Sequence, residues 1–157
     1  MKTNTLKKMI FLPLLALLGA CASDQVQPEN PEVAQKLAAI DRTQKAVLVI
    51  YRNADSNGRG VHPTVTMNGK DLVDTGNGEV FVAGLNPGHY VLEMDNKNSG
   101  TDVTVKAGDE VYLRVDIVQG FWRPSGRMTQ VTPQQGGYEA QRMDLVSPNH
   151  IDMPEYR

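Results

Sequence analysis

The chain of 157 residues has a single cysteine and only three histidines. One cysteine cannot form an internal disulfide, and the cysteine cluster that a structural zinc site needs is absent. The histidines lie far apart in the sequence and form no H-x-H or i, i+4 pair of metal ligands: His62, His89 and His150. We therefore predict a protein with no metal-binding residues and no cofactor.

The chain also lacks a strong net charge and a long hydrophobic run. It has 16 Lys and Arg against 18 Asp and Glu, a net charge of −2 and a mean hydropathy of −0.37. A nucleic-acid-binding domain normally presents a basic face, so we expect no nucleic-acid partner. The composition is typical of a globular domain and not of a protein with several membrane-spanning helices.

Motifs for catalysis or nucleotide binding are absent as well. The sequence has no G-x-S-x-G elbow, H-E-x-x-H helix, P-loop or dinucleotide-binding fingerprint. Paired carboxylates, which glycosidases use, occur where turns are expected, and there they favour solvation over catalysis: Asp71 with Asp74, and Asp109 with Glu110. We expect no catalytic residues, and a hydrolase acting on peptidoglycan or other glycans is the enzymatic alternative.

The first twenty residues have the features of an export signal. Three lysines precede an apolar run over residues 9–18, and no Asp or Glu occurs before Asp24. As a helix, residues 9–20 would be about 18 Å long, which is short of the roughly 30 Å hydrocarbon core of a bilayer. A basic start, a short apolar stretch and small residues after it are typical of a secretory signal. We predict that residues 1–20 are cleaved off.

The end of this signal resembles the lipobox of bacterial lipoproteins: Leu18, Gly19, Ala20 and Cys21. In that family the peptidase cleaves just before the cysteine, here between Ala20 and Cys21. The resemblance implies that Cys21 carries diacylglycerol on its sulfur and an acyl chain such as palmitate on its new amine. Two or three acyl chains anchor a protein effectively permanently. The alternative is an ordinary signal peptide cleaved after Ala20, which would leave a free thiol.

The residue after the cysteine indicates which of the two bacterial membranes would hold the lipoprotein. In enterobacterial lipoproteins an Asp there is associated with inner-membrane retention, and this chain has Ala22. The resemblance therefore implies an outer-membrane anchor with the protein facing the periplasm. Without Lys2, Lys7 and Lys8 the mature chain would carry 13 basic and 18 acidic groups, a net charge near −5. Charge alone would not hold such a body on an anionic lipid surface.

Residues 21–44 are predicted to link the acylated cysteine to the folded domain. Residues 22–31 are polar and contain two prolines, which is typical of an extended tether reaching roughly 30 Å. A helix is expected over about residues 31–41, with Asn30 as its cap and Pro31 in its first turn. Its apolar residues share one face: Val33, Leu37 and Ile40. We expect this face to pack on the domain edge, and a partner-binding helix is the alternative.

The sequence predicts a strand-rich domain over residues 45–144. Residues 46–51 form a continuous apolar, β-branched run, which is typical of a central strand covered on both faces. Later segments alternate between apolar and polar residues, as half-buried strands do: 64–68, 89–94, 102–106 and 111–117. In the last of these, the pattern places Tyr112, Arg114 and Asp116 on the solvent side.

Turn signals separate these strands every 8 to 12 residues and include Asn68-Gly69, Asn77-Gly78 and Asn86-Pro87-Gly88. Such spacing is typical of a β-sandwich or a small barrel. We therefore predict an all-β fold, an antiparallel β-sandwich of about seven strands, preceded by the short helix and the lipid-anchored tether. After residue 120 the pattern weakens. Residues 128–131 are a candidate last strand, residues 137–144 a helical turn or an edge strand, and residues 145–157 a poorly packed polar tail.

One loop carries the candidate binding residues, Trp122, Arg123 and Arg127. It places the only tryptophan of the chain between Phe121 and Arg123. An aromatic ring beside arginines can stack on a sugar or anchor a partner protein. We expect instead that Trp122 plugs one end of the sandwich while both arginines stay solvated, and the binding role is the alternative.

Several strand and turn segments together resemble a family of short bacterial lipoproteins that carry domain of unknown function 2846: residues 49–52, 65–69, 85–92 and 107–114. The resemblance covers roughly residues 45–142 and is looser to PEGA-type and carboxypeptidase-regulatory-like sandwiches. It implies a sandwich on a lipid tether and brings no established catalytic residues.

We therefore expect a lipid-anchored protein of the outer membrane, facing the periplasm, that acts as a non-enzymatic interaction or structural module. Its expected partners are the membrane, through the anchor, and an envelope protein. The alternatives are a module that binds glycan, peptidoglycan or a small ligand through the loops around Trp122, and an envelope hydrolase.

Overall fold

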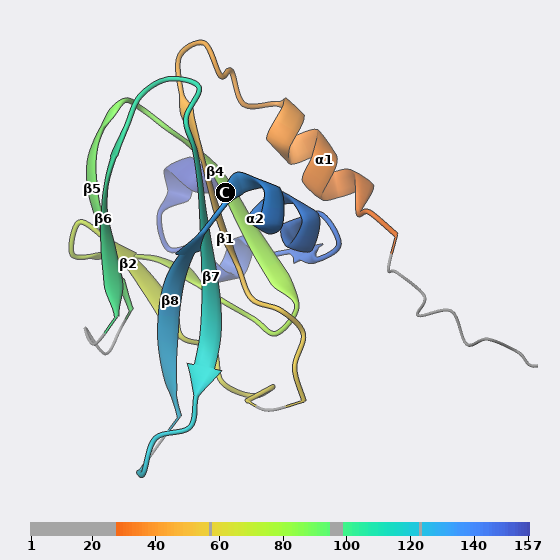
Figure 1. Ribbon diagram of the computed structural model, residues 1–157, viewed down its shortest axis with the longest axis vertical. Coiled ribbons are helices and arrows are strands. Elements are labelled where there is room, and N and C mark those ends of the chain that lie inside the picture. The colour runs from red at the N-terminus through yellow and green to blue at the C-terminus, as the bar shows by residue number, and fades with distance from the viewer. Residues whose placement is uncertain (1–27, 57, 95–98, 123) are drawn as a thin grey trace, which may run out of the picture.

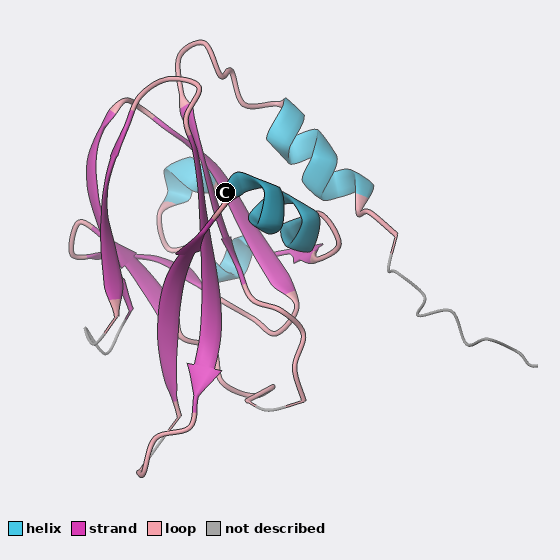
Figure 2. Cartoon of the chain, viewed as in Figure 1, coloured by secondary structure: helices cyan, strands magenta, loops and turns pink. Residues whose placement is uncertain are grey.

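Figure 1 shows the computed structural model, which describes residues 28–56, 58–94, 99–122 and 124–157. Two β-sheets face each other, and two short helices lie on the outer side of the larger sheet (Figure 2). The signal segment and the lipobox lie outside the described residues. Within the described part of the chain, no helix is long and apolar enough to cross a bilayer.

The larger sheet has five strands in the order β8 (Ser125–Val131), β7 (Glu110–Val118), β1 (Ala46–Tyr51), β4 (Glu79–Leu85) and β9 (Asp144–Leu145). The smaller sheet has four strands in the order β3 (Lys70–Asp74), β2 (Thr64–Met67), β5 (Gly88–Met94) and β6 (Gly100–Val105). Two of the predicted turns are confirmed, because Asn68, Gly69 and Gly78 all adopt positive φ there.

Two parts of the fold prediction were wrong. The described residues form nine strands, not about seven, and the larger sheet is mixed, not antiparallel. β1 runs parallel to β7, and β4 runs parallel to β9. The alternation of apolar residues locates strands but does not identify their neighbours, and the chain passes through five other strands between β1 and β7.

β1 is the central strand that its composition predicts. Its side chains alternate between two apolar clusters, and all six of its residues are buried. Ala46, Leu48 and Ile50 point into the space between the sheets. Val47 and Val49 point the other way, toward the helices. The sheet therefore has two packed faces, and the molecule has three layers.

The helix α1 (Pro31–Ala38) begins where it was predicted. The Asn30 side chain accepts a hydrogen bond from the Glu32 backbone N at 3.0 Å, which caps the first turn. Val33 and Leu37 are buried against the outer face of the larger sheet. The predicted apolar face therefore packs on the domain.

The second helix, α2 (Pro133–Ala140), was only partly anticipated, as a helical turn or an edge strand over residues 137–144. It begins earlier, where the Thr132 hydroxyl accepts a hydrogen bond from the Gln135 N at 3.3 Å. The two glycines of the helix, Gly136 and Gly137, obscure its signal because glycine disfavours helix interiors. A β-carbon at Gly136 would lie 2.5 Å from three carbons of Tyr112. The glycine therefore lets α2 cover Tyr112, which is 4% exposed and not on a solvent face as predicted.

The C-terminal segment is packed, so the prediction of a poorly packed tail was wrong. Val146 and Ile151 are buried in the core between the sheets. The segment bonds to both sheets, through Val146 N to Val80 O at 2.9 Å and Asp152 N to Leu72 O at 3.0 Å. Its prolines begin the short 3-10 helices η1 (Pro148–His150) and η2 (Pro154–Tyr156). Two apolar residues spaced among prolines are too weak a pattern to reveal this packing.

Candidate functional site

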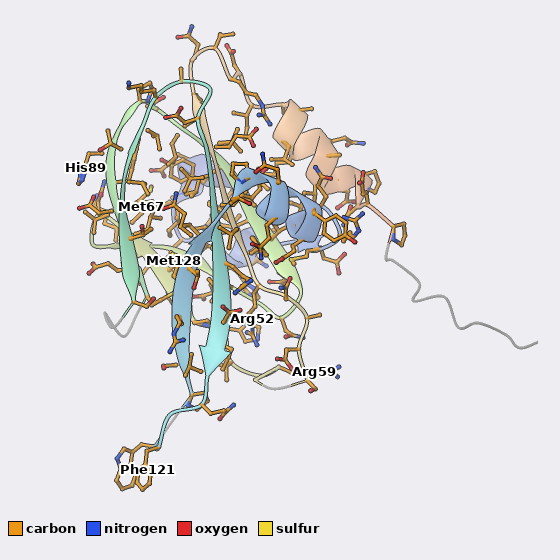
Figure 3. All side chains as sticks on the ribbon, in the orientation of Figure 1. Arg52, Arg59, Met67, His89, Phe121 and Met128 are labelled. Atoms are coloured by element: carbon orange, nitrogen blue, oxygen red, sulfur yellow. The ribbon has the colours of Figure 1, made fainter. Side chains whose placement is uncertain are left out.

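The candidate binding residue Trp122 lies at the tip of the hairpin formed by β7 and β8. The ladder of this hairpin ends at the pair Val118 and Ser125, and the connecting loop projects beyond it. Figure 3 shows Phe121 at the far end of this loop, away from the body of the protein. Phe121 is 93% exposed and Trp122 is 91% exposed. Trp122 therefore does not plug the sandwich, and that expectation was wrong.

The two tip rings contact each other. Their centroids are 5.0 Å apart with an interplanar angle of 84°, an edge-to-face pair. Arg127 lies lower on the hairpin, in β8 opposite Asp116, with an exposed side chain. Arg123 lies outside the described residues. The structure thus places Trp122 and Arg127 on one hairpin and adds Phe121 to the candidate site.

The stem of the hairpin is held firmly against the body. A β-carbon at Gly58 would lie 3.0 Å from Ile117 near the end of β7, and one at Gly126 would lie 3.0 Å from Pro63. The Ser99 hydroxyl bridges to the Met128 backbone, accepting from its N at 2.8 Å and donating to its O at 3.2 Å. The tip is therefore a projecting loop on a packed stem.

The loop beside this stem is tied down by a buried arginine. Arg52 is 2% exposed and donates from Nη1 to the Val61 carbonyl at 2.5 Å and from Nη2 to the Gly58 carbonyl at 2.7 Å. Figure 3 shows Arg52 within the body and Arg59 in the loop beyond it. The hydrogen bonds of Arg52 give it a structural role in holding this loop.

A second candidate site is a cleft of about 470 Å³ between α2 and the end of β1. Its lining is mostly polar: Asn53, Ala54, Asn77, Gly78, Glu139, Arg142, Met143 and Asp144. These residues are far apart in the sequence, so no local motif marks them. Of the polar groups here, Glu139 is the best connected.

Glu139 ties α2 to β1. Its Oε2 accepts hydrogen bonds from the Tyr51 hydroxyl at 2.8 Å and the Asn53 amide at 3.1 Å, and its Oε1 accepts one from the Gln135 amide at 2.9 Å. Burial raises the pKa of Glu139, but the hydrogen bonds from Gln135, Tyr51 and Asn53 and the charge of Arg114 more than offset it, and the pKa lies below its ordinary value. Burial and the bond to Glu139 raise the pKa of Tyr51. Glu139 is therefore ionised near neutral pH and has its oxygens occupied by the chain itself.

Arg142 forms another wall of the cleft. Its guanidinium lies over the Tyr138 ring, with Cζ 4.1 Å from the ring centroid, and its Nη1 donates to the Tyr138 carbonyl. Its Nη2 lies 3.8 Å from a carboxylate oxygen of Glu29. Its Nε is buried and has no hydrogen-bond partner among the described residues. The cleft therefore combines an ionised carboxylate with a guanidinium that keeps one unused donor.

The fold brings two of the three histidines together and keeps the third apart from them. His89 pairs with Asp102 on β6, and the rings of His62 and His150 lie edge to face with centroids 5.9 Å apart. Asp74 accepts from the Thr64 hydroxyl at 2.5 Å. Within the described ranges, no group of three or more potential ligands is placed to hold a metal ion.

Comparison with known proteins places the chain in a family. The family model described as "Protein of unknown function (DUF2846)" matches residues 42–127. The match begins just before β1 and ends within β8, so it includes the hairpin tip and excludes both helices. No curated protein shows significant similarity to the chain. Because the match spans more than half of its length, the chain belongs to the family of proteins of unknown function DUF2846.

Proposed function

We propose that this protein is a lipid-anchored, periplasm-facing module of the outer membrane that binds a partner without catalysing a reaction. The observation that carries the proposal is the hairpin tip, where Phe121 and Trp122 are 93% and 91% exposed. A soluble protein gains nothing in stability from two bare aromatic rings, and exposed apolar groups of this size are typical of binding surfaces. Aromatic residues are also enriched among the residues that dominate binding energy.

The anchor rests on the resemblance of the first residues to a lipoprotein signal. Leu18, Gly19 and Ala20 precede the single Cys21 at the end of a short apolar run. The tether would enter the folded body at Asn30, which is fixed by its N to the Gln141 carbonyl at 2.6 Å and by its side chain to the Met143 carbonyl at 2.9 Å. The looser resemblance to PEGA-type and carboxypeptidase-regulatory-like domains stays a prediction.

A test of the anchor is metabolic labelling of cells with an alkyne fatty acid. The native chain should take up the label and lose the mass of residues 1–20. Cys21→Ser should remain unlabelled, whereas the matched control Ala22→Ser should be labelled like the native chain. Label on the Cys21→Ser chain would contradict the proposal, and so would its absence from the native chain.

A second candidate function is binding of a small polar ligand in the cleft between α2 and β1. The buried Nε of Arg142 favours it, because a buried donor without a partner is costly unless something pairs with it. Catalysis there is disfavoured, since an ionised Glu139 with its pKa lowered and three hydrogen bonds is neither a general acid nor a strong base. Titration with peptidoglycan fragments, followed by backbone NMR shifts at Asn53 and Asn77, tests this function. No shifts, or equal shifts in Arg142→Gln, would contradict it.

A further inference from the structure

We propose that the β7–β8 tip inserts into lipid, so that Phe121 and Trp122 enter the interfacial layer of the same membrane that holds the anchor. This inference rests on the proposed function and names the partner of its binding site. It gives the protein two attachments to one bilayer, the acyl chains at the N-terminus and an aromatic tip on the folded body.

The first support is the extent of exposure at the tip. Phe121 and Trp122 are adjacent, contact each other and are both more than 90% exposed, whereas Tyr138, the other large hydrophobic residue exposed in the described chain, is 58% exposed. The Trp122 indole combines a large apolar surface with one N–H donor, and this combination favours the boundary between acyl chains and water. Together with the purely apolar ring of Phe121 it forms a single apolar knob at the tip.

The second support is the charge of the sequence on either side of Phe121 and Trp122. Between Asp116 and Glu139 the chain has no acidic residue, and its only charged side chains are Arg123 and Arg127. This basic stretch belongs to a chain in which acidic groups outnumber basic ones. Basic side chains beside an inserted loop complement anionic lipid headgroups, and acidic ones would be repelled by them.

The third support is the shape of the hairpin. The tip lies at one end of the long axis of the molecule, and α1 begins at its end nearer to the tip (Figure 1). The tether predicted from the sequence, with a reach of roughly 30 Å, would let the body turn this end toward the bilayer. The packed stem around Gly58 and Gly126 already holds the loop in its projecting position before it meets the bilayer. Insertion therefore costs little additional conformational entropy.

These features favour lipid over a protein partner. The residues that dominate a protein interface usually lie at the centre of a broad patch whose rim excludes water. Here the rings stand at the end of a projecting loop, beside the exposed Gln119 and Gly120, and Figure 3 shows no broad surface of described residues around Phe121. A fluid lipid phase needs no such rim.

Trp122 is the only tryptophan of the chain, so its fluorescence reports on the tip alone. The acylated full-length product is purified from cells and reconstituted into vesicles of phosphatidylethanolamine and phosphatidylglycerol. Co-flotation with the vesicles measures attachment, and quenching by aqueous acrylamide or by lipids brominated on the acyl chains measures the position of the ring. We expect emission at shorter wavelength, quenching by brominated lipid, and acrylamide quenching reduced at least about threefold relative to an exposed control tryptophan.

The matched control moves the tryptophan to another exposed aromatic position. In the double variant Trp122→Phe and Tyr138→Trp, the fluorophore lies on α2, where the native side chain is 58% exposed. That tryptophan should remain accessible to acrylamide and escape the brominated lipid. Phe121→Asp, with Trp122 retained, should return Trp122 to water because a charge at the tip resists insertion.

The outcomes separate the two proposals. Failure of the native chain to co-float would overturn the anchor. Co-flotation with Trp122 as accessible to acrylamide as the control tryptophan would overturn tip insertion and leave the anchor standing. If Trp122 stays accessible on vesicles but becomes shielded when envelope proteins are added, the partner is a protein and the lipid inference is wrong.

Discussion

Aromatic side chains are buried at the base of the β7–β8 hairpin, where Tyr112 pairs with Val131, and exposed at its tip. At the base, Tyr112 is 4% exposed, beneath α2, whereas at the tip Trp122 is 91% exposed. Gly136 permits the close contact at the base, and the ladder that joins the two regions is continuous from Tyr112 to Val118. One hairpin therefore contains a residue built into the fold and a residue that the fold leaves bare.

The fold has helices and a C-terminal segment that cover apolar side chains elsewhere, so the exposure of the tip is not due to a lack of such elements. The helices cover the outer face of the larger sheet, and even the C-terminal segment buries Val146 and Ile151 between the sheets. Stability and function are thus expected to depend on different ends of the same hairpin. This distinction fails if the base tolerates substitution or if the tip does not.

The largest effect is expected at the base. Tyr112→Ala removes a buried aromatic ring, and we expect a loss of about 3–5 kcal/mol in the free energy of unfolding, as for other buried aromatic truncations. Urea denaturation measures the loss. The exposed Tyr138→Ala serves as the control and should change stability little. A loss below about 1 kcal/mol for Tyr112→Ala would contradict the assignment of the base as core.

The close contact between α2 and Tyr112 is tested by adding one methyl group. In Gly136→Ala the new carbon would lie 2.5 Å from Tyr112 carbons, so we expect a loss of about 1–3 kcal/mol despite the better helix propensity of alanine. In the matched control Gly137→Ala the nearest atom is the Tyr112 hydroxyl oxygen at 3.7 Å. That variant should be neutral or stabilised by up to about 1 kcal/mol. Equal stabilisation by both substitutions would refute the contact.

A smaller effect is expected where Glu139 holds α2 to β1. Tyr51→Phe removes the 2.8 Å hydrogen bond and should cost about 1 kcal/mol. The ionised form of Glu139 is favoured in the folded chain, so its contribution is complete above the ordinary pKa of 4.5 and is lost as the pH falls through the lower folded pKa. Glu139→Gln should therefore flatten the loss of stability on acidification. Unfolding curves recorded from pH 7 downward check this, and identical pH profiles for both proteins would contradict it.

The smallest effect on stability is expected at the tip. Phe121→Ser and Trp122→Ser should each change the free energy of unfolding by no more than about 0.5 kcal/mol, because both side chains are more than 90% exposed. Thermal unfolding of the detergent-solubilised chain measures this. A loss larger than about 1 kcal/mol would mean that the tip packs in solution, and it would remove the distinction between the two ends of the hairpin.

Local features of the fold could be predicted from the sequence. The Asn30 cap, the apolar run of β1 and the glycine turns at Gly69 and Gly78 depend on neighbouring residues, and the structure confirms them. The parallel pairing of β1 with β7 depends on residues distant in sequence, and so does the cover that Gly136 allows over Tyr112. Periodicity carries no information on such contacts.

The candidate sites divide in the same way. The composition of the hairpin loop drew attention to Trp122, but only its three-dimensional position distinguishes a plug from a projecting tip. Glu139 and Tyr51 are 88 positions apart in the sequence, and no motif connects them. The resemblance to the family extended to residue 142, whereas the family match ends at residue 127. The helix that carries Glu139 is therefore a feature of this chain beyond the matched region.

The most direct test of the account is photo-crosslinking in intact cells, with a photoreactive phenylalanine analogue in place of Trp122. If the tip lies in the membrane, the chain should form adducts with lipid, detected as lipid-sized mass additions on the peptide that contains position 122. The same analogue at Tyr138 should give few lipid adducts. A discrete protein adduct at position 122, with no lipid adduct, would contradict the claim that the tip contacts the membrane.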